Sequence, residues 1–398
     1  MHKTLWASLA LATALTASTA AAQSWDDTVS AARGQEVYFN AWGGSEAIND
    51  YILWVAQQVR NQYGIRLEHV KVADTGDVVS RVLAEKAAGR TENGTVDLVW
   101  INGENFRAMK EQDLLLDPWT HRLPNYRYVD VENKPTVLMD FSTPVDNMEA
   151  PWGMAQLVFM YDSQRVNTPP RSMPQLLEFA QANPGRVTYP APPSFYGTTF
   201  LKQALLELVE DTDVLYSDAQ QADIGATLAP LWAFLDALHA VAWQGGRTFP
   251  GDAPEMKQLL NDGAILLSLS FNPNDAANAV ALGELPASVR SYVHEGGTIG
   301  NTHFVAIPAN ASAPEAAQVV ANFLMSPDAQ ARKADPEIWG DPTVLSIQRL
   351  NEQQRRWFED IPLSPQTLTS AELASVLPEP HASWVSVLEA EWQNRYAR

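Results

Sequence analysis

The sequence contains no cysteine. This absence excludes disulfide bonds, zinc sites built on thiolates, and a lipid anchor attached through an N-terminal cysteine. Positive charge is also scarce: 27 Lys and Arg stand against 47 Asp and Glu, and the formal net charge is −20. Nucleic acids and anionic membrane surfaces repel so acidic a chain, so neither is expected as a partner.

Past its N-terminus the chain lacks an apolar run of the roughly 20 residues that cross a bilayer. The N-terminus itself has the three parts of an export signal. Lys3 supplies the basic start, residues 5–17 form a short apolar segment, and Ala20 and Ala22 are the small residues that signal peptidase requires. We therefore expect residues 1–22 to be removed. A soluble exported protein without a lipid anchor needs an outer membrane to retain it, which indicates the periplasm of a Gram-negative bacterium.

Motifs of common enzymes are absent. The sequence has no His-Glu-x-x-His, Gly-x-Ser-x-Gly, Walker-type loop or Gly-x-Gly-x-x-Gly. His294, Glu295 and His303 lie near one another in the sequence, but their spacing matches no metal motif. We expect no catalytic residue, no metal and no cofactor. Carboxylate pairs are available anywhere in so acidic a chain, which leaves a secreted carbohydrate-acting enzyme open as an alternative.

Strand and helix patterns alternate through the first third of the chain. Apolar strand-like runs occupy residues 36–40, 65–72 and 96–101. Ser45 and Asp77 are plausible N-caps of the intervening helices, and Gly64 follows the last apolar position of the first one. This order predicts a parallel sheet covered by helices.

A second α/β unit follows. Strands are expected at residues 155–161, 186–190 and 264–269, and a long helix at 226–241. After a strand at 303–308 the remainder is mostly helical. The pattern predicts two α/β lobes joined by two crossings, near residues 150–162 and 295–304. The first lobe would comprise 23–155 and 300–398, and the second 156–299.

The loops that follow the strands carry the candidate binding residues, because ligands of open α/β sheets bind beyond the carboxyl ends of strands, near helix N-termini. Each residue also has an ordinary structural explanation, such as a turn, a cap or packing. The candidates are Trp42, Gly43, Gly44 and Ser45; Asn102, Gly103, Glu104 and Asn105; Tyr196, Gly197 and Thr198; and Phe271 with Asn272.

The order of these features resembles the type II periplasmic solute-binding proteins of ABC importers, over essentially the whole mature chain. The resemblance rests on residues 37–45 and 96–105, on Pro151-Trp152-Gly153 through Tyr161-Asp162, on Tyr196-Gly197-Thr198, and on Ser326-Pro327 with Gln330. Residues 97–106 are most similar to the YnjB type, whose substrate is not settled. The resemblance implies a monomer whose two lobes close on a small solute, with Trp152 near the hinge. It also implies docking on a membrane permease that works with an ATPase.

The nature of the solute stays open. The aromatic residues with Glu104 favour a flat or cationic organic molecule, and Trp42 would also suit a sugar. Glycine and hydroxyl loops at helix starts would suit an oxyanion. Ferric iron is not expected, because iron-binding relatives use paired tyrosines and Tyr196 has no tyrosine neighbour. A periplasmic sensor that presents a ligand to a receptor would share the fold and is the other alternative.

Overall fold

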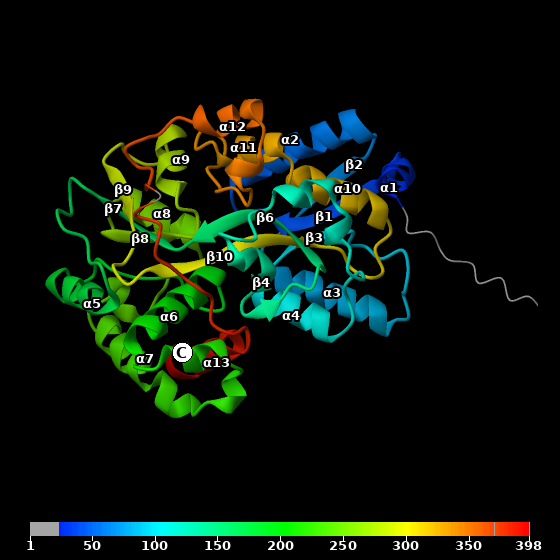
Figure 1. Cartoon of the computed structure of the whole chain (residues 1–398). Coiled ribbons are helices and arrows are strands. Elements are labelled where there is room, and N and C mark those ends of the chain that lie inside the picture. The colour runs from blue at the N-terminus through cyan, green and yellow to red at the C-terminus, as the bar shows by residue number, and fades with distance from the viewer. Residues whose placement is uncertain (1–23, 370, 398) are drawn as a thin grey trace, which may run out of the picture.

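Two β-sheets with separate cores organise the chain into two lobes (Figure 1). The structure is a computed structural model that describes residues 24–369 and 371–397. The export signal expected at residues 1–22 lies outside the described residues.

The first lobe is built on a mixed sheet. Its strand order is β2–β1–β3–β10, and both β6 and β11 also pair with β10. The pairs β1–β2 and β1–β3 are parallel, as the alternation of strands and helices predicts, whereas β10 runs antiparallel to β3 and β6. The strands are β1 (Glu36–Trp42), β2 (Arg66–Val72), β3 (Leu98–Ile101), β6 (Glu149–Gln156), β10 (Thr298–Ala306) and β11 (Val376–Leu377).

Helices cover both faces of this sheet because its buried strands are apolar on both sides. Val37 and Phe39 of β1 pack in one core with α2 and α10, and Val99 of β3 packs in another with α3 and α4. Gly64 ends α2 in the left-handed conformation, with a φ of 72°, as its position predicts. The helices are α1 (Trp25–Ala32), α2 (Glu46–Tyr63), α3 (Thr75–Ala87), α4 (Gly103–Glu111), α10 (Pro314–Leu324), α11 (Pro327–Ala334) and α12 (Glu352–Glu359).

The second lobe has a smaller antiparallel sheet in the order β8–β7–β9. Its strands are β7 (Val158–Asp162), β8 (Leu267–Ser270) and β9 (Val289–Tyr292), and its helices are α5 (Met173–Ala182), α6 (Phe195–Leu208), α7 (Ile224–His239), α8 (Ala253–Asn261) and α9 (Asp275–Ala281). The prediction of a strand at residues 186–190 is wrong. This segment joins no sheet, because its carbonyls at Arg186 and Val187 accept from Leu266 and Trp243 instead, and Pro190 has no N–H to donate.

Shorter elements connect the larger ones. Asp74, rather than the expected Asp77, caps α3 by accepting a hydrogen bond from the Gly76 N–H. A two-residue hairpin joins β4 (Met139–Asp140) to β5 (Thr143–Pro144). Short 3-10 helices occupy Thr120–Arg122, Pro124–Tyr128, Pro135–Leu138, Thr212–Tyr216, Ala219–Gln221, Trp243–Gly246 and Ile347–Arg349.

The two predicted crossings are present, where β6 leads into β7 and where β9 leads into β10. A third crossing was not predicted. After α12 the chain runs back along β10 through β11, and α13 (Ser383–Tyr396) ends beside α6 (Figure 1). Trp384, Leu388 and Trp392 of α13 lie in the second core. The last helix therefore packs on the second lobe and not, as the sequence suggested, on the first.

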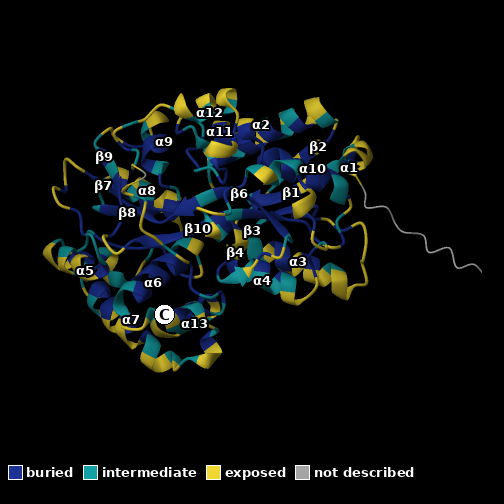
Figure 2. Cartoon of the chain, in the orientation of Figure 1, coloured by how far each residue is buried: buried dark blue, intermediate teal, exposed yellow. Residues whose placement is uncertain are grey.

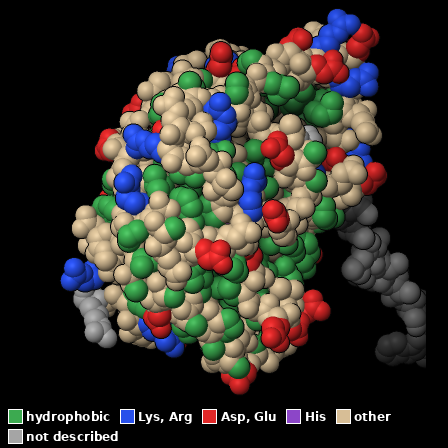
Figure 3. All heavy atoms as spheres, turned by 90° about the vertical axis from the view of Figure 1, so that its left-hand side faces the viewer, with side chains coloured by type: hydrophobic (Ala, Val, Ile, Leu, Met, Phe, Trp, Pro, Cys, Tyr) green, Lys and Arg blue, Asp and Glu red, His purple; other side chains and the backbone are tan. Residues whose placement is uncertain are grey.

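The sheets and inner helix faces are buried, and exposed residues lie mainly on the outer helices and loops (Figure 2). None of the described helices is long and apolar enough to cross a bilayer. Figure 3 shows the face formed by the second lobe, where acidic and basic side chains are interspersed with apolar ones.

Candidate functional site

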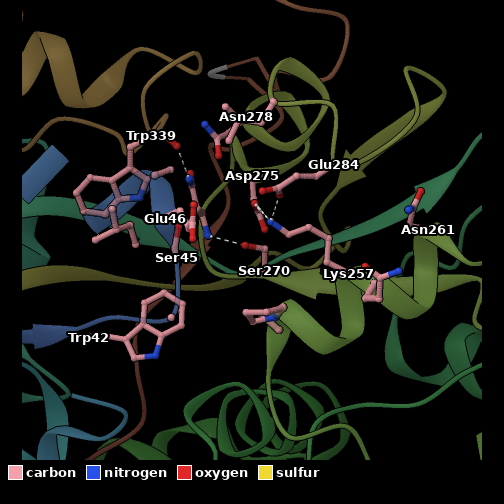
Figure 4. Close-up of a pocket in the computed structure, with 18 of the residues that line it drawn as sticks. Trp42, Ser45, Glu46, Lys257, Asn261, Ser270, Asp275, Asn278, Glu284 and Trp339 are labelled. Carbon is pink, nitrogen blue, oxygen red and sulfur yellow. Dashed lines mark hydrogen bonds and ion pairs between the residues drawn. The ribbon is translucent and has the colours of Figure 1, made fainter. Parts of the chain in front are cut away.

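A cavity of about 530 Å³ lies between the two lobes. The loop after β1 and the start of α2 line it from the first lobe, and α8, α9 and the loops around them line it from the second (Figure 4). The side chains that concern its chemistry are Trp42, Ser45, Glu46, Tyr196, Lys257, Asn261, Ser270, Asn272, Asp275, Asn278, Glu284 and Trp339.

Trp42 forms an aromatic wall on the first-lobe side. A β-carbon at Gly44 would lie 2.3 Å from the indole Cζ2, so only glycine lets the ring lie against the loop. The Asn49 side chain donates to the Gly43 carbonyl at 3.1 Å and fixes the loop. Ser45 occupies the N-cap of α2, but its hydroxyl makes no capping hydrogen bond, which leaves it free for a ligand.

The second-lobe wall combines Tyr196 with an ion-paired lysine. Burial raises the pKa of the Tyr196 hydroxyl, and Asp275 adds to the effect, so the hydroxyl stays protonated. The Lys257 ammonium lies 2.8 Å from Asp275 and 3.4 Å from Glu284 (Figure 4). Burial alone would lower the pKa of Lys257, but the two carboxylates raise it above its ordinary value. Lys257 therefore remains charged.

Trp339 closes the cavity toward the centre of the molecule. Trp339 is 4% exposed and belongs to the first core, and its ring centroid lies 5.5 Å from that of Tyr51 and 5.4 Å from that of Trp152. The Asn272 side chain donates to the Trp339 carbonyl at 3.0 Å. A residue of the second lobe thus holds this first-lobe loop in place.

The cavity is acidic. Its lining contains the carboxylates Glu46, Asp275 and Glu284 and the single ammonium of Lys257. Glu46 comes from the first lobe and makes no ion pair with any described residue, whereas the other two carboxylates share Lys257. No group of three His, Asp or Glu among the described residues could hold a metal ion.

The structure places five of the predicted site residues on the cavity: Trp42, Gly44, Ser45, Tyr196 and Asn272. Others have structural positions. Trp152 is fully buried among aromatic rings, Phe271 lies in the second core, and Gly43 lies beside Lys71. A β-carbon at Gly197 would approach the Pro190 carbonyl to 2.4 Å, so this glycine permits close packing at the start of α6.

The remaining predicted residues lie at a second contact between the lobes. Asn102, Gly103, Glu104 and Asn105 form the start of α4, and Thr198 is in the first turn of α6. A carboxyl group of the chain itself accepts a hydrogen bond at each of these two sites. The Gly103 N–H donates to Asp140 at 2.8 Å, and the Thr198 hydroxyl donates to Glu389 at 2.7 Å.

A buried ion pair completes this contact. The Lys202 ammonium lies 2.6 Å from the Glu379 carboxylate, and both side chains are 2% exposed. Asn301 of β10 donates to the other Glu379 oxygen at 3.0 Å. Burial raises the pKa of Glu104 to about 7 and the pKa of Asp140 well above its ordinary value. We call Glu104, Asp140, Glu379 and Glu389 the carboxyl cluster.

Sequence reasoning missed most of the polar lining. Glu46 and Asp275 lie one and three residues beyond predicted site residues, so their proximity was a usable signal. Lys257, Glu284 and Trp339 come from α8, the loop after α9 and the loop after α11, where nothing in the local sequence points to a ligand.

Residues 54–346 match the family described as bacterial extracellular solute-binding protein. Together with a cavity between two α/β lobes, this match shows that the chain belongs to that family, whose role is the capture of a solute. The family and the two-lobed type II fold predicted from the sequence are confirmed.

Within the family, the chain is 49% identical to the protein YnjB of Escherichia coli (strain K12) over 375 residues, which is 94% of each chain. Solved structures of binding proteins share its fold, among them the following two. The TpPotD lipoprotein of Treponema pallidum has a TM-score of 0.64 and 14% identity, and the match covers 90% of this chain and 98% of that one. The periplasmic binding protein AfuA from Actinobacillus pleuropneumoniae has a TM-score of 0.63 and 13% identity, covering 91% and 99%.

Proposed function

We propose that this protein captures an organic cation with a flat or apolar portion in the cavity between its lobes and delivers it to an ABC permease. The observation that carries the proposal is the combination of aromatic walls from both lobes with three carboxylates against one ammonium. Delivery to a permease rests on the family and on the fold that the chain shares with binding proteins of ABC importers. Capture without chemical conversion is expected.

Aromatic rings and carboxylates attract the same kind of ligand. The face of an indole or phenol ring is electron-rich and attracts a cation within about 6 Å. Trp42 on one lobe and Tyr196 on the other offer such rings, and Glu46 and Asp275 add charge on the same two sides. A cation bound between them would contact both lobes at once, and such contacts favour the closed arrangement.

The same cavity offers weaker binding to an oxyanion than to a cation. At the start of α4 the Gly103 N–H already donates to Asp140, and in the first turn of α6 the Thr198 hydroxyl donates to Glu389. The start of α2 lines the cavity, but its first residue, Glu46, is a carboxylate. An anion in the cavity would lie near Glu46 and Glu284, and like charges repel. A neutral sugar would contact the ring of Trp42 but would leave the Glu46 carboxylate without a charged partner among the described residues.

Purified protein lacking residues 1–22 provides the test. Native mass spectrometry after gentle purification should reveal a co-purified small molecule that carries positive charge. Calorimetric titration with that molecule should give one binding site per chain, and Trp42→Ala and Tyr196→Ala should each weaken binding strongly. Trp357→Ala is a matched control, because Trp357 is an exposed tryptophan on α12 and does not line the cavity.

Two outcomes would contradict the proposal. Tighter binding of a neutral or anionic analogue than of the matched cation would overturn the solute class. Accumulation of a product over many turnovers would overturn capture without conversion and favour an enzyme.

A further inference from the structure

A first-lobe loop at the cavity is held by three asparagines of the second lobe. This loop, residues 335–342, carries Trp339 and is called the Trp339 loop below. The side-chain amides of Asn272, Asn274 and Asn278 donate to the carbonyls of Trp339, Gly340 and Pro336, at 3.0, 2.7 and 2.8 Å. We call these three residues the asparagine latch. Trp339 and Asn278 lie on the same side of the cavity in Figure 4.

The Trp339 loop is fixed to the first lobe by other contacts. Asp341 pairs with the buried ammonium of Lys333, and it lies 3.0 Å from Nε2 of His303 on β10. The Pro342 carbonyl accepts from the Met154 N–H of β6 at 3.0 Å. Because the loop is attached to the first lobe and the asparagines belong to the second, the three hydrogen bonds join one lobe to the other.

The latch is a fitted contact and not a chance approach of two surfaces. Asn272 Oδ1 accepts from the Asn274 N–H at 2.9 Å, which orients the amide so that its NH₂ faces the Trp339 carbonyl. Gly340 has a φ of +79°, and a β-carbon there would lie 2.7 Å from the Asn274 Cβ. The close approach of the two lobes therefore depends on glycine at this position.

These contacts give Asn272 a role within the protein fold. The sequence suggested a ligand-binding role, but its amide already makes hydrogen bonds within the protein on both sides. We propose that Asn272, Asn274 and Asn278 are positioning residues that set the equilibrium between closed and open lobes and hold the Trp339 wall in place. A contact that is lost when the lobes separate shifts that equilibrium by its own free energy, and the affinity for solute follows the population of the closed state.

The test uses the full mature chain without any solute, so its outcome does not depend on the proposed solute class. Because the protein has no cysteine, Gln57→Cys on α2 and Gln181→Cys on α5 place spin labels at one exposed position on each lobe. Pulsed electron resonance then gives the distribution of distances between the lobes. Asn274→Asp and Asn278→Asp keep the side-chain shape and remove one donor each.

Asn261→Asp is the matched control. Asn261 also lines the cavity, and its side chain makes no hydrogen bond that the described residues provide, so the substitution adds the same charge without touching the latch. In the latch variants, a longer interlobe distance should gain population by about fivefold to tenfold relative to wild type, as expected for one lost hydrogen bond. The control should keep the wild-type distribution.

An unchanged distribution in both latch variants would overturn the proposal and would identify the asparagines as static hinge contacts. A shift of the same size in Asn261→Asp would also overturn it, by assigning the effect to charge. Should Asn278→Asp fail to fold because the residue is buried, Asn274→Asp decides alone, since Asn274 is only partly buried.

Discussion

The Trp42 indole lies so close to Gly44 that a β-carbon at position 44 would come within 2.3 Å of its Cζ2. Gly44→Ala should therefore displace the ring from the cavity wall. We expect solute affinity to fall by about tenfold, as for the loss of roughly 1.4 kcal/mol of aromatic contact. Titration calorimetry with the co-purified solute measures the change.

The matched control for this substitution is Gly296→Ala, because a β-carbon there would meet no atom within 4 Å. Its affinity and thermal stability should equal those of wild type. Wild-type affinity in Gly44→Ala would show that the position of the indole does not matter for binding.

Glu46 and Lys257 should affect cation binding in opposite directions. Glu46→Gln removes an unpaired carboxylate from the cavity and should weaken the binding of a cation. Lys257→Gln removes the ammonium that neutralises Asp275 and Glu284 and should strengthen it. Both effects should shrink as salt is raised, because ions screen exposed charges. Titrations at low and high salt measure this, and changes of the same sign in both variants would contradict the charge argument.

The carboxyl cluster should make stability depend on pH through Glu104, whose pKa burial raises from 4.5 to about 7. A raised carboxyl pKa means that the folded state holds its proton where the unfolded state has lost it. The stability that Glu104 contributes is therefore greatest below pH 4.5 and declines as the pH rises from 4.5 to 7. Glu104→Gln stays neutral and should lack this part of the decline, so it should melt higher than wild type at pH 8 and equally at pH 4.

Thermal melts of both proteins from pH 4 to pH 8 measure this difference. Burial also raises the pKa values of Asp140, Glu379 and Glu389, so part of the decline should remain in the variant. Parallel melting curves at all pH values would show that Glu104 does not titrate in this range.

The buried pair of Lys202 and Glu379 should be costly to break from one side only. Lys202→Met leaves the Glu379 carboxylate buried without a cation, and we expect a loss of about 3–5 kcal/mol in the free energy of unfolding. The double variant with Glu379→Gln should recover most of that loss, because no buried charge remains. Urea unfolding measures all three proteins.

An exposed pair serves as the comparison. Arg356 and Glu352 on α12 are 65% and 74% exposed, and Arg356→Met should change stability by less than about 1 kcal/mol. Equal losses in the single and double variants at Lys202 would show that packing, and not the unpaired charge, accounts for the effect.

The elements predicted correctly are those whose signal is local. Consecutive residues of the sequence suffice to predict the apolar strands β1 and β3 and the Gly64 cap. The alternation of strands and helices identifies the fold class. No local sequence signal indicates on which lobe α13 packs. Trp384 and Trp392 would pack equally well on any apolar surface, and it is the pairing of β11 with β10 that leads the chain to the second lobe.

The same distinction holds for the cavity. Trp42, Ser45 and Tyr196 follow strands or open helices, which is a position that physical reasoning associates with ligands. Lys257 and Glu284 reach the cavity from within and after helices, and only the three-dimensional path brings them there. Trp339 was not predicted as a site residue because a tryptophan in a loop is ordinarily expected to pack in the core. In this structure it packs in the first core and also lines the cavity.

The third crossing has a practical consequence. The first described helix, α1, packs against α10 on the first lobe, whereas α13 packs against α6 on the second. The two ends of the described chain are thus attached to different bodies (Figure 1). Fluorescent proteins fused to the two ends would move with different lobes, so their energy transfer would report solute occupancy directly and turn the molecule into a sensor for its own cargo.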